Sequence, residues 1–155
     1  MSRVAVITLA DFNNYGNRLQ NYALEKLIVE MGYEVDSIVP YRPNIIKEAV
    51  KTVVRKKDVP FTQKLLQLKR LNNFLSFDKK YAHTYSINDN DFHTIPIENY
   101  DCFISGSDQV WNPDWADYTY DKMFLRFCSK NQRISYAASF GVDEIPDKLR
   151  EKYAV

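Results

Sequence analysis

The chain has 155 residues, which is enough for one domain with a substantial core and too few for two domains of ordinary size. Hydrophobic residues (45%) and charged residues (26%) occur in globular proportions, and four Gly and six Pro exclude collagen-like and low-complexity chains. Two cysteines exclude a disulfide scaffold, and a net charge of +1 excludes a chain that is cationic as a whole. The first apolar run, Val4–Ile7, is too short for a signal peptide, and no run is long enough to span a membrane. We therefore expect a cytoplasmic protein.

The N-terminal part of the chain predicts a strand–helix–strand unit. Arg3–Leu9 is a β-branched apolar run, typical of a strand that is buried on both faces. After a polar turn over 11–17, apolar residues at helical spacing predict a helix over 18–31. Glu34–Val39 predicts a second strand. This order favours an α/β fold with a Rossmann-like parallel sheet and flanking helices.

Residues 42–80 differ from the rest in charge. They hold eleven Lys or Arg against three acids, whereas the remainder holds ten bases against seventeen acids. We predict a basic helical insertion over about 42–82, with helices from Ile45 to Arg55 and from Phe61 to Tyr81. Two interpretations remain open: a solvated basic face, or a surface for anionic lipid, an anionic acceptor or an acidic partner. The pattern matches no known nucleic-acid-binding module, so we expect no nucleic-acid partner.

The C-terminal half alternates irregular segments with further strands. We expect an irregular segment (84–99), a strand (100–105), a loop with a short turn (114–124), a brief strand or helical piece (125–128), a strand (133–138) and a helix from Pro146. That last helix has no cap after it. It reads either as a short terminal helix or as the point where a longer protein continues.

Three apolar strands each run directly into a polar loop that contains glycine, at 11–17, 106–112 and 139–141. The carboxyl ends of parallel strands lie at one edge of the sheet, so these loops should share a rim where ligands bind. Glycine permits close approach of backbone N–H groups, and the helix that follows the first loop favours an anion. The chain lacks both G-x-G-x-x-G and G-x-x-x-x-G-K-[ST], which disfavours a dinucleotide or P-loop site.

Several residues of this rim can be interpreted in two ways. Asp108 follows a buried strand, where it would act as a base or orient a sugar hydroxyl, or else accept N–H bonds within its own turn. Trp111 would stack on a sugar or cover the sheet edge. Asn14 and Asn17 would contact substrate or cap the following helix. The two cysteines have no close Cys or His companions, so we expect no metal site.

Three segments together resemble the polysaccharide pyruvyl transferase family. They are N-Y-G-N-R-L-Q-N-Y-A-L at 14–24, G-S-D-Q-V-W-N at 106–112 and S-Y-A-A-S-F-G at 135–141, in the family's order. The resemblance implies two Rossmann-like domains that face a cleft, as in GT-B glycosyltransferases. It also implies transfer of pyruvate from phosphoenolpyruvate to a sugar, as a ketal, in bacterial exopolysaccharide, capsule or cell-wall polymer biosynthesis. This chain matches the N-terminal half, so the second domain would be absent and the fragment alone inactive.

The resemblance also implies that the two halves of the enzyme bind different substrates. This half would bind a nucleotide- or lipid-linked sugar acceptor, while the missing half would hold phosphoenolpyruvate as the donor substrate, with no cofactor or metal. Asp108 would be the catalytic base or acceptor-orienting group. The candidate substrate-binding residues are Asn14, Tyr15, Gly16, Asn17, Gly106, Ser107, Gln109, Trp111, Asn112 and Ser139. Because acceptors of this family can be lipid-linked, the basic insertion would contact an anionic membrane at its inner face. Two alternatives stay open: a non-catalytic sugar- or nucleotide-binding Rossmann-like module, and a short flavodoxin-like binding domain.

Overall fold

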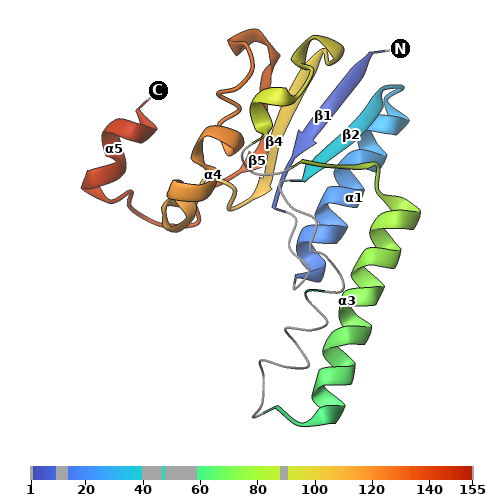
Figure 1. Ribbon diagram of the computed structural model, residues 1–155. Coiled ribbons are helices and arrows are strands. Elements are labelled where there is room, and N and C mark those ends of the chain that lie inside the picture. Colours follow the sequence, from blue (N-terminus) through green and yellow to red (C-terminus); the bar gives the residue numbers. More distant parts are fainter. Residues whose placement is uncertain (1, 10–13, 40–46, 48–58, 88–90, 155) are drawn as a thin grey trace.

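The computed structural model describes residues 2–9, 14–39, 47, 59–87 and 91–154. Their centre is a sheet of five parallel strands in the order β3-β2-β1-β4-β5 (Figure 1). The strands are β1 (Arg3–Ile7), β2 (Glu34–Val39), β3 (Thr84–Ser86), β4 (Cys102–Asp108) and β5 (Arg133–Ala138). The helices are α1 (Tyr15–Glu30), α3 (Phe61–Tyr81), α4 (Ala116–Met123) and α5 (Asp147–Tyr153). Short 3₁₀ turns lie at Phe92–Thr94, Ile97–Asn99, Pro113–Trp115 and Lys130–Gln132.

The strand order confirms the predicted α/β fold with a parallel sheet. An order of 3-2-1-4-5 is that of Rossmann-like sheets, whereas a flavodoxin-like sheet runs 2-1-3-4-5. The flavodoxin-like alternative is therefore wrong for the described strands. The order reverses between β1 and β4, which pair from Val4↔Cys102 to Ile7↔Ser105. Ligands of open α/β sheets bind beside such a reversal, at the carboxyl ends of the strands.

The sheet is covered on both faces, which explains the continuous apolar run of β1. Successive residues of a strand point to opposite faces. Val4 and Val6 pack with Leu24 and Ile28 of α1 on one face. On the other face, the core of Ala5, Ile7, Ile38 and Phe103 is closed by residues from 87–100 and 110–128. The prediction that β1 is buried on both faces is confirmed.

Helix α3 connects β2 to the neighbouring parallel strand β3 and projects well away from the sheet (Figure 1). Its C-terminal half packs on α1, where Tyr22 contacts Phe77 and Tyr81 with ring centroids 5.7 and 5.9 Å apart. The predicted bounds of this helix, 61–81, are confirmed. The helix predicted over 45–55 lies outside the described residues, apart from Lys47. No described helix, α3 included, is long and apolar enough to cross a bilayer.

Four local predictions are wrong. Residues 84–86, expected to be irregular, form β3, because their backbone pairs with the edge of β2 from Ser37↔Thr84 onward. Strand β4 continues past Ser105 to Asp108. Residues 116–123, expected to be a loop, form α4, whose Tyr120 and Met123 are buried. Residues 125–128 are neither strand nor helix but turns.

The predicted C-terminal helix is present as α5 and is fixed by aromatic contacts. Pro146 stands at its N-cap position. Tyr153 packs against Tyr120, Phe124 and Phe140, with ring centroids 5.2, 5.3 and 5.6 Å away. These contacts join α5 to α4 and to the loop that follows β5.

Candidate functional site

The ends of β4 and β5 form a pair of strained, closely packed backbones. Gly106 has a φ of +135°, and a Cβ there would lie 1.9 Å from the carbonyl oxygen of Tyr136. Only glycine fits such an approach. Asp108 has a φ of +73°, and Ala137 on the facing strand has a φ of +48°. Non-glycine residues in the left-handed region are uncommon and concentrate at functional sites.

Hydrogen bonds join the loops after these two strands. The backbone carbonyl of Asp108 accepts bonds from Val110 N and Ser139 N, each at 2.9 Å. Trp111 N donates in turn to the carbonyl of Ser139 at 3.1 Å. The Gln109 side chain lies against the second loop, since a Cβ at Gly141 would meet its Cδ at 2.3 Å. The structure therefore brings Asp108, Gln109, Trp111 and Ser139 together, as the shared rim predicted.

The turn at Asp108 is held through the backbone of this residue. Both turn hydrogen bonds at this residue go to its backbone carbonyl. Among the hydrogen bonds of the described residues, none reaches the Asp108 carboxylate, and the residue is only half-buried. This arrangement does not support the turn-capping interpretation of the side chain. Ser107, the neighbouring candidate, lies inside β4.

Trp111 and Asn112 make contacts that shape the loop. Trp111 donates its indole N–H to the carbonyl of Met123 at 3.0 Å and stacks on Phe124 with centroids 5.0 Å apart. Asn112 is buried, donates to Gln109 Oε1 at 3.2 Å and accepts from Asp114 N at 2.9 Å. These contacts agree with the interpretation of Trp111 as a cover of the sheet edge.

The first rim loop delivers the start of α1. Asn14 caps the helix, because its Oδ1 accepts bonds from Gly16 N at 2.8 Å and Asn17 N at 3.4 Å. The cap explains why α1 begins at Tyr15, three residues before the predicted start. Asn17 is buried, whereas Tyr15 is half-exposed and stacks on Phe74 of α3 at 4.4 Å. Because β1 pairs with β4, this helix start and Asp108 lie at the same edge of the sheet.

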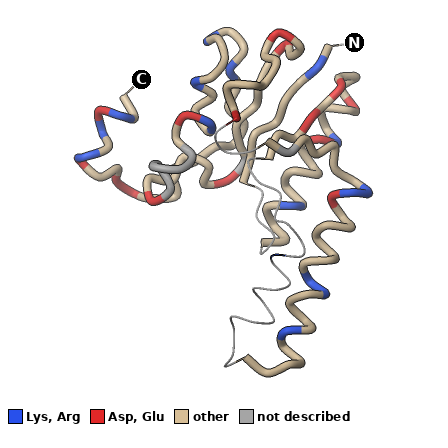
Figure 2. The backbone as a smooth tube through the Cα atoms, viewed as in Figure 1, with Lys and Arg blue, Asp and Glu red and all other residues tan. Residues whose placement is uncertain are grey.

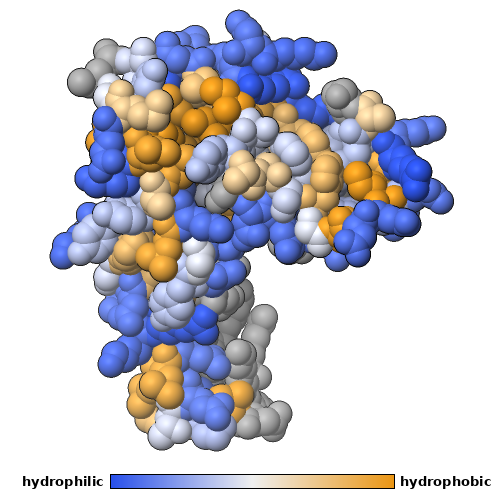
Figure 3. Space-filling view, turned by 180° about the vertical axis from the view of Figure 1, so that it is seen from behind, coloured by the Kyte–Doolittle hydropathy of each residue, from blue (hydrophilic) through white to orange (hydrophobic). Residues whose placement is uncertain are grey.

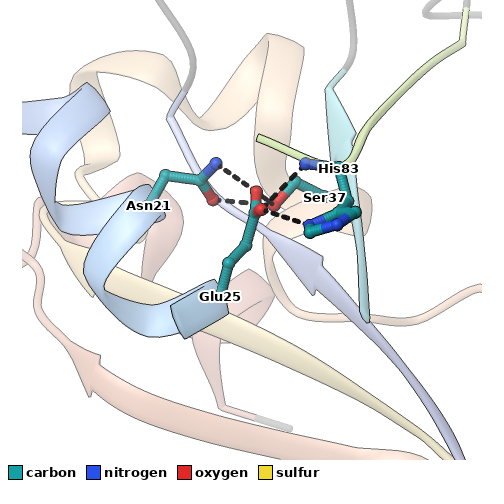
Figure 4. Close-up of polar contacts among 4 residues, drawn as sticks. All are labelled: Asn21, Glu25, Ser37 and His83. Carbon is teal, nitrogen blue, oxygen red and sulfur yellow. Dashed lines mark hydrogen bonds and ion pairs between the residues drawn. The ribbon is translucent and has the colours of Figure 1, made fainter. Parts of the chain in front are cut away.

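A buried polar network that the sequence patterns did not predict lies in the middle of α1. Glu25 is buried, and its carboxylate accepts from Asn21 Nδ2 at 2.9 Å and from the backbone N of His83 at 2.8 Å (Figure 4). His83 Nδ1 lies 3.2 Å from the same carboxylate, and the Ser37 hydroxyl also bonds to it. The network joins α1, β2 and the residue before β3. The sequence feature that could have indicated this network is the position of Asn21 and Glu25, which lie at helical spacing beside the buried residues Leu24 and Ile28.

Part of the 14–24 segment that carries the family resemblance thus builds the scaffold. Asn21 belongs to the Glu25 network. Arg18 forms a buried ion pair with Asp78 of α3, with Nη1 and Oδ2 3.2 Å apart. Asn14 is the helix cap. The residues of this segment that resemble the family therefore include some that anchor α1, as well as some that lie at the rim.

Neither cysteine is set up as a nucleophile. Burial raises the pKa of the Cys102 thiol and of the Cys128 thiol. Cys128 is buried and donates to the carbonyl of Leu125 at 3.3 Å. A raised pKa keeps a thiol protonated and unreactive. Across the described ranges, no group of three or more His, Cys, Asp or Glu gathers closely enough to hold a metal ion.

The strand order and the reversal between β1 and β4 define a Rossmann-like domain of the α/β class. The profile of the family described as polysaccharide pyruvyl transferase matches residues 14–155, which include all three resembling segments. The chain therefore belongs to the polysaccharide pyruvyl transferase family. No curated protein and no solved structure matches it significantly.

Proposed function

We propose that this chain is the acceptor-binding domain of an enzyme that transfers pyruvate from phosphoenolpyruvate to a sugar as a ketal. Membership of a transferase family supports the reaction class. The acceptor would be a nucleotide- or lipid-linked sugar of a bacterial exopolysaccharide, capsule or cell-wall polymer. The reaction would take place in the cytoplasm, with the acceptor presented at the inner face of the membrane where it is lipid-linked.

The observation that carries the proposal is the position of the Asp108 carboxylate. It lies at the carboxyl end of β4, beside the reversal of strand order, on a backbone fixed by Gly106 and Ser139. A side chain on a fixed backbone is pre-organised for a substrate. A carboxylate accepts hydrogen bonds from sugar hydroxyls, and as a general base it typically contributes ~10²–10⁴-fold to a rate.

The chemistry assigns Asp108 a specific step. The methylene carbon of phosphoenolpyruvate is protonated, which gives an oxocarbenium-like centre at the adjacent carbon. A sugar hydroxyl attacks that centre and loses its proton to the base. The phosphate then leaves with its bonding electrons, and a second hydroxyl closes the ring as it loses its own proton. One donor and one sugar diol thus give one cyclic ketal and one inorganic phosphate.

The donor needs a different kind of site. Phosphoenolpyruvate carries a carboxylate and a phosphate, which are best held by Arg or Lys in charge-assisted pairs. The candidate rim residues supply amides, hydroxyls, an indole and one carboxylate instead. We assign the donor site to a second Rossmann-like domain that faces this rim in a GT-B-like pair.

The test is the Asp108→Asn substitution in the complete protein. Asn tolerates the left-handed backbone and keeps the size of the side chain, so only the charge and basicity are removed. We expect turnover to fall by ~10²-fold or more, with the KM for phosphoenolpyruvate unchanged. The readout is the pyruvate-sized mass added to the acceptor. Asp114→Asn, an exposed acid in the neighbouring turn, is the matched control. Unchanged turnover of Asp108→Asn would remove Asp108 from the reaction.

The alternative from the sequence is a non-catalytic sugar- or nucleotide-binding module, which would use the same rim without the donor chemistry. A module of this kind would bind acceptor sugars in calorimetry and add no mass to them when phosphoenolpyruvate is supplied to the complete protein.

A further inference from the structure

The first turns of α3 expose large apolar side chains at the end of the helix farthest from the sheet. Phe61 is 68% exposed, Leu65 50% and Leu66 65%. Figure 3 shows apolar residues gathered at this lower end of the molecule, separate from those over the sheet and α1. Together with Lys64 and Lys69 we call these residues the arm tip. Apolar side chains of this size in water mark a surface that another apolar phase covers.

The charge of α3 is one-sided. Its basic residues are Lys64, Lys69, Arg70, Lys79 and Lys80, and its one acid is Asp78. Asp78 is buried at the opposite end of the helix, where it pairs with Arg18 at 3.2 Å. The charged residues of α3 other than Asp78 are therefore all basic, and Figure 2 shows them as blue segments along the helix. Such a surface attracts an anionic one.

The contacts between α1 and α3 hold the helix and leave the tip projecting. Arg70 lies over the Tyr15 ring with its guanidinium carbon 5.1 Å from the centroid, and Phe74 stacks on the same ring at 4.4 Å. Tyr22 contacts Phe77 further along. Since a helix rises ~1.5 Å per residue, Phe61 lies about 13 Å beyond Arg70 along the axis. The tip is thus carried on a helix that is anchored at its other end.

We propose that the arm tip docks onto the surface of an anionic lipid bilayer. Phe61 and Leu66 are about 140° apart around the helix axis at ~100° per residue. That arc is wider than the ~100° stripe by which a helix usually packs against a protein partner. A bilayer surface surrounds the end of the helix, so it buries both. Lys64 and Lys69 are within one turn of these side chains and would reach the headgroups.

A second copy of the chain is a poorer occupant. Tip-to-tip packing would bring Lys64 and Lys69 of one copy against the same lysines of the other. Like charges at close range disfavour that contact, whereas each basic residue near an anionic membrane strengthens binding by ~5-fold. The basic charge of the arm tip therefore favours an anionic lipid surface over a second copy of the chain.

Vesicle co-sedimentation tests the proposal. We expect the protein to bind vesicles that contain phosphatidylserine and not vesicles of phosphatidylcholine alone, with binding weakened by salt. The variant Phe61→Ser/Leu66→Ser should bind ~30-fold less tightly or weaker still, and Lys64→Gln/Lys69→Gln about 25-fold less. A Phe61→Trp variant should shift its emission to the blue on anionic vesicles as the indole leaves water.

Matched controls separate the tip from exposed apolar surface in general. Leu19 and Met31 of α1 are 57% and 64% exposed, so Leu19→Ser/Met31→Ser should bind anionic vesicles within twofold of the unaltered protein. Circular dichroism of each variant checks that its fold is unchanged. Absence of binding to anionic vesicles at low salt would overturn the proposal. So would full binding by Phe61→Ser/Leu66→Ser, or a lipid-free dimer that this variant abolishes. Turnover with a soluble acceptor should be unchanged in these variants. The vesicle experiment can therefore fail or succeed whether or not the protein has the proposed enzyme activity.

Discussion

The substitution Glu25→Gln tests whether the buried network of α1 holds the sheet edge in place. Oε1 accepts from Asn21 Nδ2 and the Ser37 hydroxyl, and Oε2 accepts from the backbone N–H of His83 and from its Nδ1 when that nitrogen carries the ring proton. A Gln side chain has one oxygen and one NH₂ group. In either orientation the NH₂ group confronts one pair of donors, so up to two hydrogen bonds to the carboxylate are lost.

The magnitude follows from the kind of bond. A hydrogen bond to a charged group is worth ~1.5–3 kcal/mol, so two lost bonds would cost about 3–6 kcal/mol. Removing a buried charge recovers part of that, because a buried carboxylate is itself costly to desolvate. We expect a net loss of about 2–4 kcal/mol in the free energy of unfolding. That is a large share of the ~5–15 kcal/mol typical of a domain.

Urea unfolding followed by circular dichroism measures the effect. With an m-value of ~1–3 kcal/mol/M, the midpoint of Glu25→Gln should fall by about 1–2 M while the slope stays unchanged. Glu30→Gln is the matched control on the same helix, since Glu30 is exposed and pairs only loosely with Lys26 at 3.8 Å. His83→Ala should cost about 1 kcal/mol or less, because its backbone N–H remains in place. A Glu25→Gln midpoint equal to that of Glu30→Gln would refute this account of the network.

Two further predictions concern the site and the sheet edge. Gly106→Ala should lower the free energy of unfolding by about 3 kcal/mol or more, since its Cβ would collide with the facing backbone, and an unaltered urea midpoint would contradict the strained geometry of β4. Burial and the 2.8 Å hydrogen bond to Asp36 raise the pKa of Tyr100 to about 12 from 10.0. The folded state therefore keeps its phenol proton where the unfolded state has lost it. The stability contributed by Tyr100 is fully present below pH 10 and is lost as the pH rises toward 12. Tyr100→Phe should flatten that part of the profile of urea midpoint against pH, and an equally steep decline would contradict the assignment.

Periodicity was enough to predict the long elements. The apolar run at Arg3–Leu9 and the helical stripe over Phe61–Tyr81 are strong local patterns, and both elements occur there, although β1 ends at Ile7. The short strand β3 has three residues and exists because the edge of β2 offers backbone partners, which no local pattern records. For the same reason, the extension of β4 past Ser105 follows from its pairing with β5.

The sequence was sufficient to predict where the candidate site lies, but not which partners its side chains contact. A carboxylate directly after a buried strand locates Asp108 at the rim, and the parallel sheet then places Ser139 beside it. The partner of Trp111 is the carbonyl of Met123. That carbonyl belongs to α4, whose residues were expected to form a loop. Glu25 was missed because a charged residue on a helix is ordinarily at the surface.

Phe140 links the rim mechanically to the last helix. Its ring lies 5.5 Å from Trp111 and 5.6 Å from Tyr153 of α5, and it follows Ser139 directly in the chain. Displacing α5 must therefore either separate Phe140 from Tyr153 or pull on the loop whose backbone N–H holds the carbonyl of Asp108. The position of α5 and the backbone geometry at Asp108 are therefore coupled through Phe140.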